Sequence, residues 1–215
     1  MRNVHWALFG ILVVLSACKK DETAGGTSSA APATAAKPPQ CVADGNKQEV
    51  SGRLISCLLS EEWKPGRYTC KKGYMVGLHP NGSLKTCSFA TPTDVDGFRC
   101  QEQTELYDNG KFKRCKLGAA KTVNGVDLRV GDWITVYKSG AVKRVELGLI
   151  PGKLKDYSCK GYMNYFHENG QLKKCELAAS AKIDGAEVAG GTFVCFDDKG
   201  KRVSDCNALT FDMLD

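Results

Sequence analysis

The chain has 215 residues, a formal net charge of +6, and eleven cysteines against three histidines. Only His79 and His167 follow the N-terminal leader and no Cys-x-x-Cys pair is present, so the composition argues against a zinc protein. The modest positive charge does not by itself select a partner.

Residues 1–17 form a short leader. Arg2 precedes an apolar stretch of 14 residues, from Val4 to Ala17. A stable membrane-spanning helix needs about 20 residues. We therefore predict that this segment is a signal peptide that is removed by processing.

The end of the leader, Leu15-Ser16-Ala17-Cys18, resembles the lipobox of bacterial lipoproteins. The resemblance implies transfer of diacylglycerol to the Cys18 thiol, cleavage before Cys18, and acylation of the new amino group, for example with palmitate. Acyl chains of this kind anchor a protein stably to a membrane. Lys19 stands where an aspartate favours retention at the inner membrane, so the outer membrane is favoured, on its periplasmic or surface side. The alternative is an ordinary secretory signal followed by an unrelated cysteine.

The segment 18–40 joins the lipidated cysteine to the rest of the chain. It is rich in Ala, Gly, Ser, Thr and Pro and has no apolar periodicity, so it cannot bury enough surface to offset the entropy of ordering. We predict a flexible tether. The remainder, 41–215, has the usual size of one domain.

Glycines recur about every 30 residues in this domain. A period of this size indicates stacked supersecondary units. The glycines are Gly52, Gly82, Gly110, Gly140, Gly170 and Gly200.

Ten cysteines remain after Cys18, and an even number in an oxidising compartment indicates five disulfides. Aligned on the glycines, five repeats carry two cysteines each and the fourth carries none, with Val145 in place of one of them. Bridges within repeats explain this joint loss, whereas bridges between neighbouring repeats would leave Cys115 without a partner. Spacing alone leaves other pairings open, but it favours Cys41–Cys57, Cys70–Cys87, Cys100–Cys115, Cys159–Cys175 and Cys195–Cys206.

Asn-Gly recurs at the periodic glycines between two extended segments, as in GYMVGLHPNGSLKTC and GYMNYFHENGQLKKC. This dipeptide predicts a β-hairpin with a two-residue type I′ turn, in which both central residues have positive φ. Each repeat is thus predicted to be a hairpin. The predicted fold is all-β, an elongated stack of about six β-hairpin repeats with a period of about 30 residues, held together by disulfides.

A two-residue loop also predicts the strand register. It places Phe166 opposite Lys173 and Tyr162 opposite Leu177 on the core face, where Val145 is also expected to be buried. The other face is predicted to carry pairs near the hairpin tips, namely His79–Leu84, Tyr107–Phe112, Tyr137–Val142 and His167–Leu172. Because tyrosine takes the histidine position in two repeats, both histidines are predicted to be structural.

The tip pattern is an aromatic or aliphatic residue, Tyr or His, any residue, Asn, Gly, any residue, Leu and Lys. It resembles the bacterial variant of MORN repeats over about residues 70 to 206. The resemblance implies hairpins stacked into an elongated ribbon and a role in binding or scaffolding. Two features differ, because the period exceeds the low twenties typical of the family and the paired cysteines are not part of its pattern.

Basic residues recur at two adjacent positions after the tip glycines. If two strands separate successive repeats, these charges recur about every 10 Å. Such a stripe suits phosphates of lipid A, an anionic cell-wall polymer or an acidic protein. Alternatively, the lysines only discourage edge pairing and keep the sheet soluble. The envelope location argues against nucleic acid. The predicted stripe consists of Lys85, Lys113, Arg114, Lys143, Arg144, Lys173 and Lys174.

No pattern typical of catalysis is found: there is no Ser/His/Asp set, zinc-binding histidine pair, phosphate loop or nucleotide fingerprint. Asp197 and Asp198 fall in a predicted turn, where aspartate is common. We therefore expect no catalytic residue, metal or cofactor. The sequence favours a lipid-anchored cell-envelope protein whose repeats bind or scaffold another envelope component. The alternative is a periplasmic inhibitor or immunity-type protein that sequesters a toxin or hydrolase, since MORN-like repeats also occur in antitoxin-like bacterial proteins.

Overall fold

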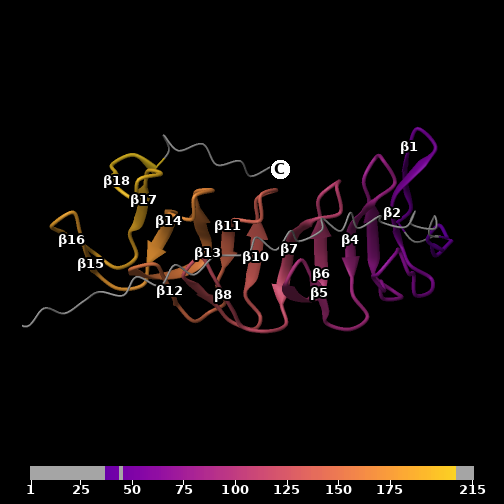
Figure 1. Cartoon of the computed structure of the whole chain (residues 1–215), viewed down its shortest axis with the longest axis horizontal. Helices are drawn as coiled ribbons and strands as arrows, with labels where there is room; N and C mark the ends of the chain where they lie inside the picture. Colours follow the sequence, from indigo (N-terminus) through magenta and orange to yellow (C-terminus); the bar gives the residue numbers. More distant parts are fainter. Residues whose placement is uncertain (1–36, 44–45, 207–215) are drawn as a thin grey trace, which may run out of the picture. The chain divides into compact units, whose positions relative to one another are not determined.

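The computed structural model describes residues 37–43 and 46–206. The leader, Cys18 and most of the tether lie outside the described residues. The described part of the chain is all-β, with eighteen strands and no α-helix, which confirms the predicted fold class. Figure 1 shows the strands following one another along the sheet in the order of the sequence.

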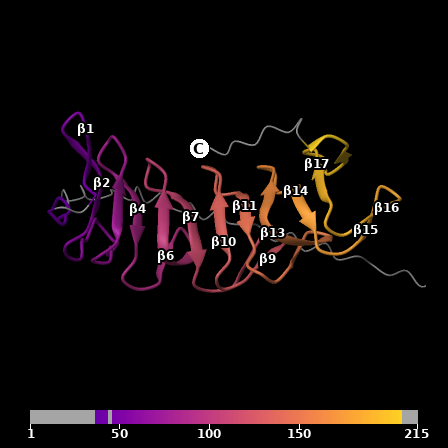
Figure 2. The same cartoon turned by 180° about the vertical axis from the view of Figure 1, so that it is seen from behind.

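One sheet of fourteen strands runs through all the repeats. Its long strands are joined by hairpins and pair antiparallel, so that their order in the sheet follows the chain; Figure 2 shows the same order from behind. These strands are β1 (Gln48–Val50), β2 (Arg53–Leu58), β3 (Met75–Leu78), β4 (Leu84–Ser88), β6 (Phe98–Leu106), β7 (Phe112–Leu117), β10 (Trp133–Val136), β11 (Val142–Glu146), β13 (Tyr157–Phe166), β14 (Leu172–Leu177), β17 (Phe193–Phe196) and β18 (Arg202–Val203).

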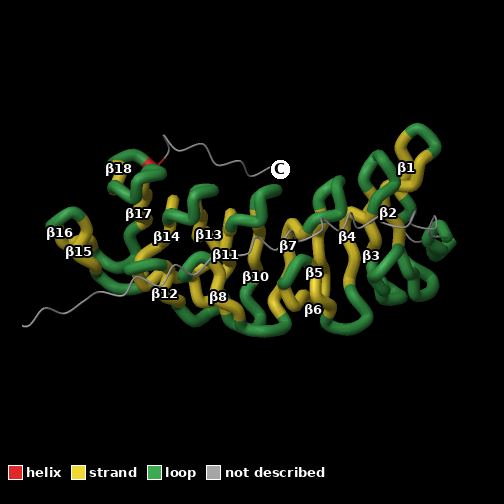
Figure 3. The backbone as a smooth tube through the Cα atoms, in the orientation of Figure 1, coloured by secondary structure: helices red, strands yellow, loops and turns green. Residues whose placement is uncertain are grey.

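Short strands form a second set of hairpins at the opposite end of the long strands from the tip loops (Figure 3). β5 and β12 pair with the beginnings of β6 and β13, whereas β8–β9 and β15–β16 are separate two-stranded sheets. From the third repeat onward, each repeat thus contributes two hairpins rather than the single one predicted. The short strands are β5 (Thr93–Val95), β8 (Lys121–Val123), β9 (Val126–Leu128), β12 (Gly152–Leu154), β15 (Ala181–Ile183) and β16 (Ala186–Val188).

The hydrophobic core joins the two sets of hairpins. Val126, Leu154 and Ile183 of the short hairpins are at most 2% exposed and belong to the same cluster as the apolar face of the long strands. The burial of a Val, Leu or Ile side chain stabilises a fold by about 1.5–3 kcal/mol. The aliphatic residues of the short hairpins therefore enlarge a core that contains few aromatic residues.

Two neighbouring rows of residues cross the main sheet. The core row is at most 1% exposed and consists of Cys57, Val76, Cys87, Thr104, Cys115, Ile134, Val145, Asn164, Cys175 and Val194. Because side chains alternate along a strand, the adjacent row lies on the other side of the sheet, which we name the outer face. This outer row consists of Ser56, Gly77, Thr86, Glu105, Arg114, Thr135, Arg144, Tyr165, Lys174, Cys195 and Val203.

The tip loops are not the predicted type I′ turns. In the fifth repeat Gly170 N–H donates to His167 O and His167 N–H donates to Gln171 O, each at 2.8 Å, which encloses a three-residue loop. Of these loop residues only Gly170 has positive φ, at 83°. The Asn169 side chain instead accepts a hydrogen bond from Gln171 N–H at 3.0 Å, an interaction that holds asparagine in a turn without positive φ. The same pattern recurs around Asn81 and Asn109.

The extra loop residue corrects the predicted faces near the tips. A three-residue loop of this kind ends in a bulge, which moves the following side chain to the other side of the strand. As a result Phe166 lies opposite Leu172 rather than Lys173. Four residues predicted on the face away from the core are in fact buried in it, at 1–8% exposure: Leu84, Phe112, Val142 and Leu172.

A second bulge explains the other register error. In β13 the chain has positive φ at Gly161, 77°, and the register shifts between Lys160 and Tyr165. Cys159, rather than Tyr162, therefore lies opposite Leu177. Val145 is 0% exposed, which confirms its predicted burial.

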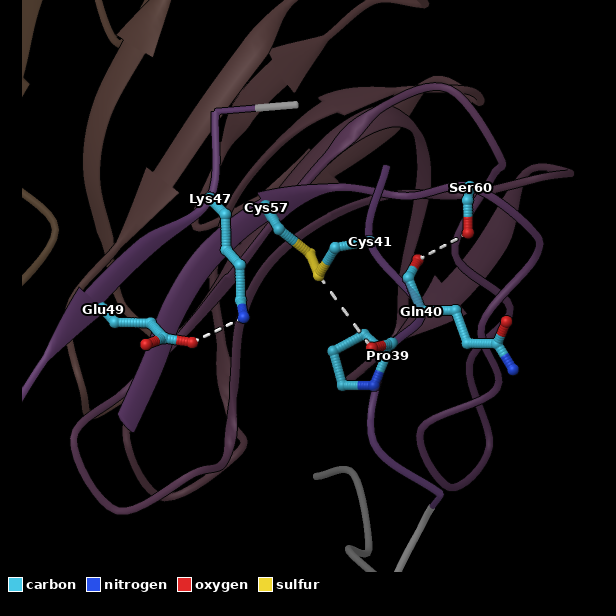
Figure 4. Close-up of a disulfide and its surroundings, with 7 residues drawn as sticks. All are labelled: Pro39, Gln40, Cys41, Lys47, Glu49, Cys57 and Ser60. Carbon is cyan, nitrogen blue, oxygen red and sulfur yellow. Dashed lines mark hydrogen bonds and ion pairs between the residues drawn. A yellow bond between two sulfur atoms is a disulfide. The ribbon is translucent and has the colours of Figure 1, made fainter. Parts of the chain in front are cut away.

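The cysteines pair within repeats, as the joint loss in the fourth repeat predicts, with Cα–Cα distances of 5.5–5.9 Å in all five pairs. Figure 4 shows the first of them, Cys41–Cys57. In four pairs the first cysteine lies opposite the residue two positions after the second; these opposing residues are Leu59, Phe89, Leu117 and Leu177. In the fourth repeat Val145 stands at the position of the second cysteine and is 0% exposed.

The fifth disulfide is not equivalent to the others. Cys195 lies in the outer row, opposite Lys174 and Val203, while its neighbours Val194 and Phe196 are in the core. Cys195 is thus paired with Cys206 as predicted, but it does not occupy the position that the first cysteine takes in the other repeats. Cys195–Cys206 instead ties β17 to the residues that follow β18 on the outer face.

Candidate functional site

A groove of about 710 Å³ lies on the outer face beside the tip loops and spans the second to the fifth repeat. The groove contains three of the predicted stripe residues, two tyrosines and two carboxylates. Its lining residues are His79, Pro80, Lys85, Tyr107, Asp108, Lys113, Tyr137, Lys138, Lys143 and Glu168.

The aromatic residues of the groove are fixed by bonds between repeats. Tyr107 Oη donates to Val136 O at 2.6 Å, and Tyr137 Oη donates to Phe166 O at 2.8 Å. Histidine makes the equivalent bond in two repeats, from His79 Nε2 to Leu106 O at 3.0 Å and from His167 Nε2 to Phe196 O at 2.8 Å. Because a carbonyl oxygen can only accept, Nε2 carries the proton in both rings. Each bond reaches the next repeat, so both histidines have the structural role that the sequence indicates.

Lysines of the groove lie over these rings. Lys113 Nζ and Lys138 Nζ are 5.5 and 5.6 Å from the centre of the Tyr107 ring, and Lys143 Nζ is 5.6 Å from that of Tyr137. The attraction between an ammonium group and an aromatic face orients the cation without neutralising its charge. The rings therefore hold a row of ammonium groups in place.

The predicted stripe does not form one continuous surface. Arg114 lies in the outer row, where it pairs with Glu105 at 3.4 Å and with Glu146 at 2.9 Å. Arg144 donates to the same Glu146. Burial lowers the pKa of Arg144, but its hydrogen bond to Glu146 and the charge of that carboxylate outweigh the effect, so the pKa is raised and the cation is retained. The arginine positions thus stabilise the sheet by matched charges.

The groove brings together Lys85, Lys113 and Lys143 of the predicted stripe. Lys173 and Lys174 are half-buried on β14 and do not line it; Lys174 Nζ lies 5.0 Å from the centre of the Phe193 ring. Sequence reasoning missed Lys138, which is in a tip loop and pairs with Asp108 of the preceding repeat at 3.5 Å. Its tip position differs from repeat to repeat, so periodicity gives no signal for it.

A second groove of about 680 Å³ lies at the N-terminal end of the sheet and shares Pro80 and Lys85 with the first. Its apolar lining includes Val50, Ile55 and Leu78. Gly77 and Thr86 of the outer row also line it, and they lie so close together that a Cβ at position 77 would be 2.5 Å from Thr86 Oγ1. The sequence analysis did not predict this groove.

Neither a metal site nor a membrane-spanning helix is found in the described residues, 37–43 and 46–206. In these residues no three His, Cys, Asp or Glu side chains gather where they could hold a metal ion. None of them belongs to a helix long and apolar enough to span a bilayer.

The fold and the groove define a disulfide-linked β-hairpin repeat protein with a basic, tyrosine-lined groove on one face. Comparison with known proteins finds no matching family, no similar curated protein and no similar solved structure.

Proposed function

We propose that the protein is a lipid-anchored component of the bacterial cell envelope whose disulfide-linked repeats form a non-catalytic binding or scaffolding module. The observation that carries this proposal is the groove in which lysines lie over ordered tyrosine rings through successive repeats. A surface repeated in this way suits an extended ligand or partner. The resemblance of the hairpin tips to MORN repeats supports the same role.

The proposed location rests on the leader and on the disulfides. The lipobox resemblance at Cys18 implies a lipid anchor, and the tether 18–40 separates the anchor from the repeats. Five disulfides are typical of proteins that fold outside the reducing cytosol. Both features favour the cell envelope, and Lys19, which stands where an aspartate favours retention at the inner membrane, favours the outer membrane on its periplasmic or surface side.

A binding role is favoured over catalysis because the polar groups of the groove are engaged in structure. The Tyr107 and Tyr137 hydroxyls and the protonated nitrogen of His79 are all bonded to backbone carbonyls. A general acid or base must instead reach the substrate proton that it transfers. The groove therefore offers oriented charge rather than a proton-transfer group.

The anchor is tested with Cys18→Ala. We expect the variant to leave the membrane fraction or to remain unprocessed, because only a thiol at this position can accept the diacylglycerol. The measurement is fractionation of cells with detection of the protein and its apparent mass, and Ser16→Ala serves as a control that keeps a small residue before the cleavage site. Membrane fractionation and mass identical to wild type would refute the lipid anchor.

The binding role is tested by crosslinking in intact cells, purification of the tagged protein and identification of what is enriched. Enrichment of an envelope polymer, or of several envelope proteins, supports the proposal. If nothing is enriched over an untagged strain, the binding role is refuted.

A second function, inhibition of a toxin or hydrolase, is favoured by one observation. In the fourth repeat, which lacks a disulfide, the aliphatic side chains Val130, Leu149 and Ile150 are 61%, 98% and 69% exposed. Apolar side chains exposed in this way are typical of protein interaction sites. Recovery of a single stoichiometric protein in the crosslinking experiment would favour this alternative.

A further inference from the structure

We propose that Asn124-Gly125, in the turn of the short hairpin β8–β9, is a site of spontaneous deamidation that Lys155 promotes. This inference goes beyond the proposed binding function and does not depend on it. The reaction needs only the residues of this turn, the neighbouring lysine and water.

The reaction begins when the backbone nitrogen of Gly125 attacks Cγ of the Asn124 side chain. A bond forms between these two atoms, the bond from Cγ to the side-chain nitrogen breaks, and ammonia leaves with the proton of the Gly125 nitrogen. The product is a cyclic succinimide. Water then adds to one of the two carbonyl groups of the ring and opens it to aspartate or isoaspartate. Glycine suits this attack because it has no side chain to hinder the approach of the backbone.

The attacking nitrogen is engaged in the other three Asn-Gly pairs of the chain. These pairs lie in the tip loops, and in each of them the glycine N–H donates a hydrogen bond that closes the loop. A nitrogen that holds its proton in such a bond is a poor nucleophile. The bonds, at 2.8–2.9 Å, join Gly82 to His79 O, Gly110 to Tyr107 O and Gly170 to His167 O.

The side chains of the tip asparagines are held as well. Each Oδ1 accepts a hydrogen bond, at 2.9–3.0 Å, from the N–H two residues further on. In addition, Asn81 Nδ2 and Asn169 Nδ2 donate to the backbone of the next tip loop. Rotation of these side chains toward the glycine nitrogen would break such bonds, so the tip loops disfavour the reaction.

The turn of β8–β9 lacks these restraints. Its ladder pairs Val123 with Val126, and the two central residues, Asn124 and Gly125, have φ 51° and 74° and are both exposed. Among the described residues, neither the Asn124 side chain nor the Gly125 N–H has a hydrogen-bond partner. The nucleophile and the group that it attacks are therefore both available.

Lys155 stabilises the reactive form of this peptide group. Its Nζ donates to Asn124 O at 2.7 Å. This oxygen and the Gly125 nitrogen belong to one peptide group, so resonance spreads the negative charge of a deprotonated nitrogen onto the oxygen. An ammonium group that already donates to the oxygen stabilises this charge as it develops. The lysine therefore raises the fraction of the nucleophilic anion.

The product changes the surroundings of the turn. Asn124 Nδ2 lies 3.7 Å from the position that a Cβ of Gly170 would take, so the side chain reaches the fifth tip loop. Deamidation places a carboxylate there, beside Lys155. Isoaspartate also adds a methylene group to the main chain of a two-residue turn, next to Val126, which is 0% exposed. The modification thus acts on the packing of β8–β9 against the repeats.

The test is incubation of the full-length protein in detergent, at neutral and at mildly alkaline pH, with samples taken over time. Peptide mapping by mass spectrometry at acidic pH measures the conversion of amide to acid at each Asn-Gly pair, and chromatography separates aspartate from isoaspartate. We expect Asn124 to convert faster than Asn81, Asn109 and Asn169, and faster at the higher pH, because the amide anion is the nucleophile. In urea, where the fold is lost, the four pairs should convert at similar rates.

The role of Lys155 is tested with Lys155→Gln. This variant should slow conversion at Asn124 about threefold, the size expected for one partly exposed charge. Lys153→Gln is the matched control, since it removes an exposed lysine from the same short strand and should leave the rate unchanged. Melting temperatures equal to wild type would show that both variants are folded.

Two results would overturn the inference. One is conversion of Asn124 no faster than that of the tip asparagines in the folded protein. The other is an equal rate at Asn124 in wild type and in folded Lys155→Gln.

Discussion

Glu102 occupies a backbone conformation that the other repeats give to glycine. The equivalent residues in the aligned repeats are Gly73, Gly131, Gly161 and Gly191, with φ between 77° and 92°. Glu102 has φ 56°, in the left-handed region that costs a residue with a side chain roughly 1–2 kcal/mol. Its carboxylate pairs with Lys116 at 3.0 Å. An exposed ion pair contributes about 0–1 kcal/mol, so it offsets only part of the strain.

We predict that Glu102→Gly is more stable than Glu102→Ala by about 1 kcal/mol. Both variants lose the ion pair with Lys116, and only glycine relieves the left-handed backbone. The measurement is the free energy of unfolding in urea for the two variants side by side. Equal stability would show that the backbone at this position is not strained.

Some residues of the groove could be predicted from the sequence and others could not. Lys113 and Lys143 follow the period and were predicted. The repeated Tyr or His position was also predicted to be structural. Its hydrogen-bond partner could not be predicted, because Tyr107 Oη donates to a backbone carbonyl of the next repeat. No sequence pattern marks a carbonyl as an acceptor.

At the scale of elements, the protein has two kinds of hairpin with similar turn sequences. Three of the four short hairpins contain two-residue turns in which both central residues have positive φ, as at Asp96-Gly97 with 47° and 81°; in the turn between β12 and β13 only Lys155 has positive φ, at 56°. The tip loops enclose three residues, although they contain Asn-Gly. Asn-Gly therefore predicted a hairpin correctly at the tips but not the length of its loop.

Contacts between tip loops explain this difference. Asn81 Nδ2 donates to Asp108 O at 3.2 Å, and Asn169 Nδ2 donates to Asp198 O at 2.6 Å. In both cases the acceptor belongs to the next tip. These bonds exist only after the repeats have stacked, so the local sequence alone does not reveal them. Because one extra residue moves the next side chain to the other side of a strand, the error in loop length also reversed the predicted position of Leu172.

We predict that Gly170→Val destabilises the protein by at least about 1 kcal/mol, because Gly170 has φ 83° and valine is strongly disfavoured there. Gly148→Val is the matched control, since Gly148 lacks positive φ and a Cβ there would meet no atom within 4 Å. The measurement is the melting temperature of both variants. A Gly170→Val protein that melts with wild type would contradict the turn geometry.

At the scale of the whole repeat array, two types of repeat alternate. In the third and fifth repeats one long strand, β6 or β13, serves both the short and the long hairpin. In the fourth repeat and the last one this strand is divided, into β9 and β10 or into β16 and β17. The two undivided strands carry Cys100 and Cys159 near their beginnings. The disulfides therefore hold the short hairpin to the main sheet where the strand is continuous.

Removal of one disulfide should have a local effect. Cys159 and Cys175 are 16 residues apart, and closing a loop of this length contributes about 3 kcal/mol in the chain-entropy model. Because repeats contact mainly their neighbours, we predict that Cys159→Ala/Cys175→Ala exposes β13 and β14 while β3 and β4 keep their protection.

Hydrogen exchange followed by mass spectrometry measures this effect in each strand, and non-reducing peptide mapping of the wild type checks the pairing first. Uniform loss of protection from β2 to β17 would contradict the local model. A Cys115–Cys159 bridge in the map would contradict pairing within repeats.

The all-β class, the period and the pairing within repeats could all be predicted because each leaves a repeated mark in the sequence. The second set of hairpins was not predicted, although turn dipeptides at Asp96-Gly97, Asn124-Gly125 and Asp184-Gly185 indicate it. These glycines do not belong to the series on which the repeats were aligned. The apolar groove at the N-terminal end was not predictable, since its lining residues come from β1 to β4 and only the folded sheet brings them together.

The two ends of the main sheet have a consequence for solubility. An open sheet edge offers unpaired backbone groups to which another chain can add. Here the last strands are brief, with three residues in β1 and two in β18. Lys47 and Glu49 place a charged pair at one end, and the Cys195–Cys206 bond ties down the chain at the other. The short, charged or tied-down strands at both ends of the sheet thus disfavour the edge-to-edge addition of another chain.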